Sequence, residues 1–77
     1  MTEKGRIKFA TNLNNAIEKS KMTKYQIAKR CGLAQSTITW WQQAKVSPKL
    51  ENLGTVAKVI GVDVSDLIKG IKTEDLL

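Results

Sequence analysis

Four side chains at helical spacing near the middle of the chain could make specific contacts to a partner: Ser36, Thr39, Trp40 and Gln43. At 3.6 residues per turn, a helix through them turns Ile38 and Trp41 to the opposite side, toward a core. The resulting outer face is hydrogen-bonding and free of acidic groups. It suits the base edges of DNA, because glutamine pairs with adenine, serine with several bases, and the threonine methyl with that of thymine. The alternative is a helix face that is merely solvated.

The adjacent pair Trp40 and Trp41 bears on this choice, because neighbouring residues of a helix cannot both face the core. The spacing from Ile38 assigns Trp41 to the core. A large aromatic side chain is unusual on a solvated helix face. Trp40 is therefore predicted to contact nucleic acid or a partner protein.

The elements that must position this face form a helix-turn-helix pattern over about residues 23–44. Thr23 is a suitable N-cap for a first helix over residues 24–31, since its hydroxyl can accept a bond from a free N–H of the first turn. Gly32 can adopt the positive φ that ends this helix. Ala28 is small where the two helix backbones would cross closely.

The second helix of the pattern is predicted over residues 35–43. Its N-cap position holds Ala34, which offers no side-chain acceptor and costs about 1 kcal/mol relative to Ser or Thr. Leu33 fills the corner between the two helices. Cys31 is expected to be buried as a small hydrophobic residue. With one cysteine and no histidine in the chain, neither a disulfide framework nor a zinc cluster can form within it.

An apolar stripe predicts a helix over residues 6–20, ahead of this pattern, while residues 1–5 are expected to be frayed. The stripe consists of Phe9, Leu13, Ala16 and Ile17. Because several asparagines make this segment a mediocre helix former, its stability should come from packing the stripe.

Two helices are predicted after the pattern. Ser47 and Pro48 are typical of the N-cap and first position of a helix that Gly61 ends. Gly54, inside this helix, could permit a close helix contact. Asp63 would cap a short helix over residues 64–69, ended by glycine at position 70. The sequence thus predicts an all-α fold of five short helices in a single domain over residues 1–77, with its core at about 6–70 and a tail at 71–77.

The positive charge of the chain is concentrated on and beside the helix-turn-helix pattern. The net charge is +6, and seven of the thirteen cationic side chains lie between residues 19 and 50, a segment without any acidic residue. This distribution is typical of a nucleic-acid binder, although a lysine-rich solvated surface is the alternative.

Several classes of function find no support in the composition. No acid–base pair, nucleophile or metal-ligating cluster can be named, so no catalytic residue, metal or cofactor is expected. No apolar run approaches the roughly 20 residues needed to span a bilayer. A cytoplasmic protein without a membrane partner or small-molecule ligand is expected.

The order of these residues resembles the Cro and repressor family of phage-type helix-turn-helix regulators, also called XRE-like, over about residues 9–70. The resemblance is carried by Ala28 and Gly32, then Ile38 with Trp40 and Trp41, then Ala44, Lys45 and Pro48, then Leu53, Ala57, Gly61 and Leu67. It implies a five-helix lambda-repressor-like domain that docks the second helix of the motif into the major groove. Ala44 stands where the family usually has glycine, so that helix could end differently or run on.

The resemblance also implies which residues contact DNA. The predicted base contacts are Gln35, Ser36, Thr39 and Trp40. The predicted contacts to the DNA backbone are Lys24, Tyr25, Thr37, Gln43, Lys45 and Ser47. The partner is expected to be a double-stranded, palindromic operator, and the protein a homodimer at least on DNA. The candidates for the dimer contact are the apolar residues left over near the C-terminus: Ile68, Ile71, Leu76 and Leu77.

Sequence-specific DNA-binding transcriptional regulation, by a phage or mobile-element protein, is the favoured function. A protein-binding adaptor or antitoxin-like module is the alternative, and it would use Trp40 or the tail residues Ile71, Leu76 and Leu77 against a protein. An enzyme is the weakest reading. Nonspecific RNA binding stays open, although no aromatic stacking platform beyond Trp40 is present.

Overall fold

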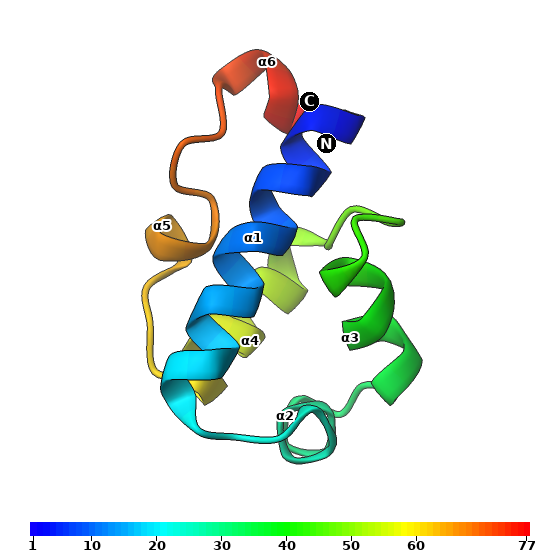
Figure 1. Cartoon of the computed structure of the whole chain (residues 1–77), viewed down its shortest axis with the longest axis vertical. Coiled ribbons are helices and arrows are strands. Elements are labelled where there is room, and N and C mark those ends of the chain that lie inside the picture. The colour runs from blue at the N-terminus through cyan, green and yellow to red at the C-terminus, as the bar shows by residue number, and fades with distance from the viewer.

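The computed structural model describes all residues, 1–77, and its regular structure is entirely helical (Figure 1). Four longer helices and two single-turn helices follow one another: α1 (Glu3–Ser20), α2 (Lys24–Cys31), α3 (Gln35–Gln42), α4 (Leu50–Ile60), α5 (Val64–Leu67) and α6 (Thr73–Leu76). The predicted all-α class is confirmed, and the tail adds the short α6 to the five expected helices. No helix of the chain is long and apolar enough to cross a membrane.

The long helix α1 is the central element of the fold. It packs against α3 on one side and against α5 on another, and it also contacts α4 and α6. The pair α2 and α3 stands beside it, with α2 also packed on α4. Both chain ends lie at the same end of α1 (Figure 1).

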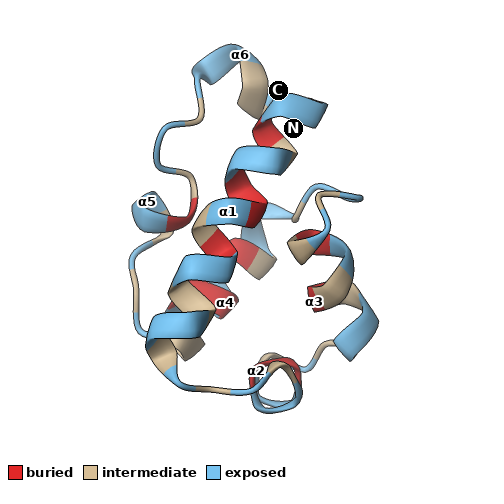
Figure 2. Ribbon diagram, in the orientation of Figure 1, coloured by how far each residue is buried: buried red, intermediate tan, exposed pale blue.

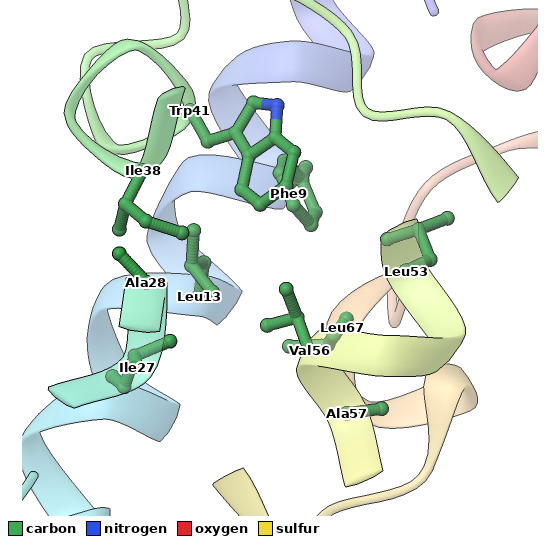
Figure 3. Packing of buried hydrophobic residues seen from close by; sticks show 10 residues of the cluster. All are labelled: Phe9, Leu13, Ile27, Ala28, Ile38, Trp41, Leu53, Val56, Ala57 and Leu67. Carbon is green, nitrogen blue, oxygen red and sulfur yellow. The ribbon is translucent and has the colours of Figure 1, made fainter. Parts of the chain in front are cut away.

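Every helix except α6 contributes buried residues to one core (Figure 2), and Figure 3 shows the side chains of this core facing one another. Its ten residues are Phe9, Leu13, Ile27, Ala28, Ile38, Trp41, Leu53, Val56, Ala57 and Leu67. The rings of Phe9 and Trp41 pack edge to face, with centroids 6.3 Å apart. This contact fixes α3 on α1, since such aromatic pairs stabilise by about 0.5–1.5 kcal/mol beyond the area they bury.

The predicted ends of α2 are confirmed. The Thr23 hydroxyl accepts a hydrogen bond from the Gln26 N–H at 3.1 Å, and the Gln26 side chain accepts one from the Thr23 N–H at 3.0 Å. Gly32 takes the left-handed conformation, with φ of 70°. The reciprocal hydrogen bonds of Thr23 and Gln26 fix where the motif begins, and the left-handed Gly32 fixes where it turns.

Cys31, at the end of α2, is only partly buried, although it packs against the core. That burial raises the pKa of its thiol, because an apolar environment disfavours the thiolate. The side chain therefore stays a neutral thiol near pH 7.

The start of the chain is helical, and the expectation of frayed residues 1–5 is wrong. Thr2 caps α1, since its hydroxyl accepts a hydrogen bond from the Gly5 N–H at 3.1 Å. The Thr2 N–H in turn donates to the Asp75 carbonyl at 2.9 Å. Gly5 is buried, and a Cβ placed there would overlap that carbonyl oxygen. The tail thus lies directly on the first turn of α1 and orders it.

Three predicted helix boundaries also differ. Helix α4 begins at Leu50 behind Lys49, because the Ser47 hydroxyl donates to the Met1 carbonyl at 3.3 Å and does not cap the helix. Helix α3 ends at Gln42 and α5 at Leu67, one and two residues earlier than expected. The expected close contact at Gly54 is absent, since a Cβ there would meet no atom within 4 Å.

Candidate nucleic-acid interface

The rotational setting of α3 agrees with the prediction from its sequence. Ile38 is fully buried and Trp41 is 2% exposed, whereas Trp40 is 46% exposed. Gln35, Ser36 and Gln43 are exposed as well, and Thr39 is half-buried. The helix therefore presents amide, hydroxyl and indole groups outward while its apolar side is held in the core.

The first turn of α3 has no side chain that caps its backbone N–H groups. As predicted, Ala34 makes no side-chain cap. The free N–H groups of a helix start carry partial positive charge and can donate hydrogen bonds to a phosphate oxygen. Thr37 is half-buried in this turn, with its N–H donating to the Ala34 carbonyl at 3.1 Å. Since the Thr37 N–H is used in this way, the N–H groups of Gln35 and Ser36 are the donors that an approaching DNA backbone would meet.

The first residue of α2 reaches the outer face of α3. The Lys24 ammonium donates to the Thr39 hydroxyl at 2.7 Å. That hydroxyl donates its own hydrogen to the Gln35 carbonyl, one turn earlier, at 3.2 Å. Lys24 was assigned to the DNA backbone on the family resemblance, and the structure places its charge beside a predicted base-contact residue.

Tyr25, the next residue of α2, is 55% exposed. The Lys29 ammonium lies 5.8 Å from the centroid of its ring, within the range of a cation–π contact. Lys29 therefore contacts the ring of Tyr25, while the hydroxyl group of Tyr25 remains available to a partner.

The ending of α3 has the backbone conformation that glycine usually provides, although alanine occupies the position. Ala44 adopts the left-handed conformation, with φ of 61°. The Lys45 N–H donates to the Trp40 carbonyl at 2.9 Å and the Ala44 N–H to the Trp41 carbonyl at 3.1 Å. These two bonds make a Schellman ending. The alanine thus neither prolongs α3 nor changes its ending, and Lys45 follows directly in an exposed position.

Arg6, on α1, holds this loop and was not identified from the sequence. Its Nε donates to the Ala44 carbonyl at 3.0 Å, and its Nη1 donates to the Met1 carbonyl at 3.3 Å. The same Met1 carbonyl accepts from the Ser47 hydroxyl. Of the two predicted contacts in this loop, Lys45 is therefore free, while the Ser47 hydroxyl is occupied within the protein. The sequence placed Arg6 only at the start of a helix over residues 6–20, and its positive charge gave no indication of this role.

No group of three or more histidine, cysteine, aspartate or glutamate side chains is placed to hold a metal ion. The start of α2 and the outer face of α3 are joined by the hydrogen bond from Lys24 to Thr39, and the loop that carries Lys45 follows α3 directly. The chemistry they offer is hydrogen bonding and positive charge.

Comparisons with known proteins agree with this arrangement. A family model described as the Cro/C1-type helix-turn-helix DNA-binding domain matches residues 12–75. The solution structure of the SOS-response transcriptional repressor LexA from Eubacterium rectale is similar, with a TM-score of 0.82 and 30% sequence identity over 95% of this chain and 78% of that chain. No curated protein matches. The two matches confirm the lambda-repressor-like fold class.

Proposed function

The chain belongs to the family of Cro/C1-type helix-turn-helix DNA-binding domains, and we propose that it is a sequence-specific transcriptional regulator that reads the major groove of double-stranded DNA with α3. The observation that carries this proposal is the setting of α3. Its apolar side, with Ile38 and Trp41, is locked in the core, while its acid-free polar side faces outward. A groove-reading helix needs that division.

Within this proposal the contact residues divide by chemistry. Base edges are met by Gln35, Ser36, Thr39 and Trp40, which lie at the start and on the outer side of α3. The sugar–phosphate backbone is met by the residues that surround them: Lys24, Tyr25, Thr37, Gln43 and Lys45. Ser47 is left out of this set, because its hydroxyl hydrogen goes to the Met1 carbonyl. Phosphate contacts set the register and most of the affinity, whereas base contacts set the sequence.

A homodimer on a palindromic operator is part of the proposal, since two half-sites one DNA turn apart require two copies of α3. Two of the residues expected to join the copies, Ile68 and Ile71, already pack against the core. An apolar groove of about 330 Å³ lies beside Ile68 and is lined mainly by residues from α4, α5 and both chain ends. Leu50, 78% exposed on this groove, is the side chain we propose for the contact between copies.

A protein-binding adaptor is the second candidate, and the exposed indole of Trp40 is the observation that favours it. It ranks lower because the side chains around Trp40 on α3 are short hydrogen-bonding groups, not an apolar patch. Action in the cytoplasm, on the DNA of a phage or mobile element, is the biological setting that the family resemblance suggests for the regulator.

Selection of bound duplexes from a random pool with the full chain tests the proposal. We expect enrichment of a palindromic consensus, with Leu50→Glu binding single half-sites normally but losing cooperative binding to the palindrome. Ile7→Glu, at a 53% exposed apolar residue of α1 that does not line this groove, is the matched control that should keep both properties. A pool that shows no enrichment would contradict a sequence-specific regulator and favour the adaptor.

A further inference from the structure

The hydrogen-bond chain from Lys24 through Thr39 to the Gln35 carbonyl limits what this part of α3 can offer to a base. A threonine hydroxyl has one hydrogen to donate. Here that hydrogen goes to the Gln35 carbonyl, and the oxygen accepts from Lys24. Thr39 therefore retains its methyl group for a base, but its hydroxyl has no hydrogen left to give.

Lys24, unlike Thr39, still has hydrogens to donate. An ammonium group has three hydrogens, and the bond to Thr39 uses one of them. Two donors remain on a nitrogen that stands 2.7 Å from a side chain of the base-contact face. Lys24 is half-buried, so its stem is packed and the charge is held at this place.

We propose that Lys24 is a specificity-determining residue of this protein and selects guanine in each half-site. The proposal deepens the function proposed above and rests on it. It also revises the expectation that Lys24 meets only phosphate.

The choice of guanine follows from the donors that remain. In the major groove guanine presents two neighbouring acceptors, N7 and O6, and lysine pairs with both. Adenine offers one acceptor beside an amino donor, and cytosine offers an amino donor, which would face the ammonium hydrogens without a partner. Thymine offers a single acceptor beside its methyl group. Lys24, fixed by Thr39, therefore fits guanine better than any other base.

Lys29, another of the three cations on α2, shows what a lysine without a contact to α3 looks like here. The Lys29 ammonium lies over the Tyr25 ring and makes no hydrogen bond to α3. It contributes to the positive field without being directed at the base-contact face. Lys29 is exposed and lies on the same helix, so it provides a control of equal charge.

The test compares duplex selections and titrations on the full chain and three variants. Lys24→Met removes the ammonium and keeps the length of the stem. Thr39→Val removes the hydroxyl that orients Lys24 and keeps the shape. Lys29→Met removes the same charge from the same helix without touching the Thr39 hydroxyl. A thermal melt of each variant verifies that it is folded.

We expect the unaltered chain to prefer guanine at one position of each half-site by about tenfold or more over the other bases. Lys24→Met should reduce that preference to about twofold or less, and Thr39→Val should reduce it in part, while the other positions of the consensus stay the same. Lys29→Met should weaken binding to all sequences alike and leave the consensus unchanged.

Two results would overturn the inference, and they are distinguishable. If Lys24→Met weakens every sequence by the same factor and retains the full consensus, Lys24 contacts phosphate only, and the regulator proposal stands without it. If the unaltered chain itself enriches no sequence, the proposed function fails first and the assignment of Lys24 fails with it.

Discussion

Trp40 and Trp41 are neighbours in the chain with opposite environments, one 46% and the other 2% exposed. An indole has a single N–H donor, so Trp40 cannot make the bidentate pairings that identify a base strongly. Gln35 and Ser36, at the start of α3, should carry more of the base identity. Trp40 adds apolar contact, for instance with thymine methyl groups.

Substitution of each tryptophan by alanine should therefore separate binding from stability. Trp40→Ala should leave the melting temperature nearly unchanged and weaken operator binding by about 1–3 kcal/mol. Trp41→Ala should lower the free energy of unfolding by about 3–5 kcal/mol, because it removes a large core side chain that packs on Phe9. A thermal melt and a DNA titration of both variants measure this. A Trp40→Ala protein that binds DNA normally but loses a protein partner would favour the adaptor.

Ala44 is the residue where the chain accepts a strained conformation to end α3. With φ of 61°, an alanine costs about 1–2 kcal/mol more than in a right-handed conformation. Ala44→Gly removes that cost but adds about 0.5–1 kcal/mol of backbone entropy lost on folding. We expect a net stabilisation of up to about 1 kcal/mol in urea unfolding.

Ala16→Gly, inside α1, is the control for this substitution. It should destabilise the fold by about 1 kcal/mol, since α1 is right-handed at that position. Equal destabilisation by Ala44→Gly would show that the left-handed ending is not a source of strain.

At the scale of helices, the sequence predicted the features that depend on residues close together in the chain. The Thr23 cap, the Gly32 ending and the burial of Ile38 and Trp41 all depend on residues within a few positions of each other, and all are confirmed. The start of α1 and the support of the loop after α3 depend on partners far away. Thr2 pairs with Asp75, and Arg6 pairs with Ala44, over separations of 73 and 38 residues. Hydrophobic periodicity describes residues within one helix and cannot predict such long-range hydrogen bonds.

Gly54 shows the same limit within one helix. The sequence indicated a weak point of α4 but not whether a neighbour required it. Since open space surrounds the position, Gly54→Ala should stabilise the fold by about 1 kcal/mol through helix propensity. Gly61→Ala, at the left-handed end of the same helix with φ of 88°, should destabilise it by about 1–2 kcal/mol. Urea unfolding of both variants is the measurement, and a destabilised Gly54→Ala protein would contradict this description of α4.

At the scale of the whole molecule, charge should dominate affinity. Seven cationic side chains lie between residues 19 and 50 without an acidic residue among them, while α3 itself carries no charged side chain. We expect on the order of four to six effective phosphate contacts per dimer, and hence a slope of about −4 to −5 for the logarithm of the binding constant against that of salt concentration.

The part that one lysine plays in this charge effect can be measured separately. Lys45→Ala should weaken binding to all sequences and reduce the slope by about one for each copy in contact. A titration series from low to moderate salt checks both numbers. A slope near zero would mean that apolar contacts dominate and would count against a phosphate-based interface.

The central claim is that DNA is met by the start of α2, the outer face of α3 and the loop after it. Amide chemical shifts of the full chain, recorded during titration with a duplex that carries a single half-site of the selected sequence, test this residue by residue without changes from contact between copies. The account predicts that the largest changes fall at Lys24, Tyr25 and residues 35–45. The amides of α5 and of the second half of α4 should change little. Changes confined to α4, α5 and the chain ends, with α3 unaffected, would contradict it.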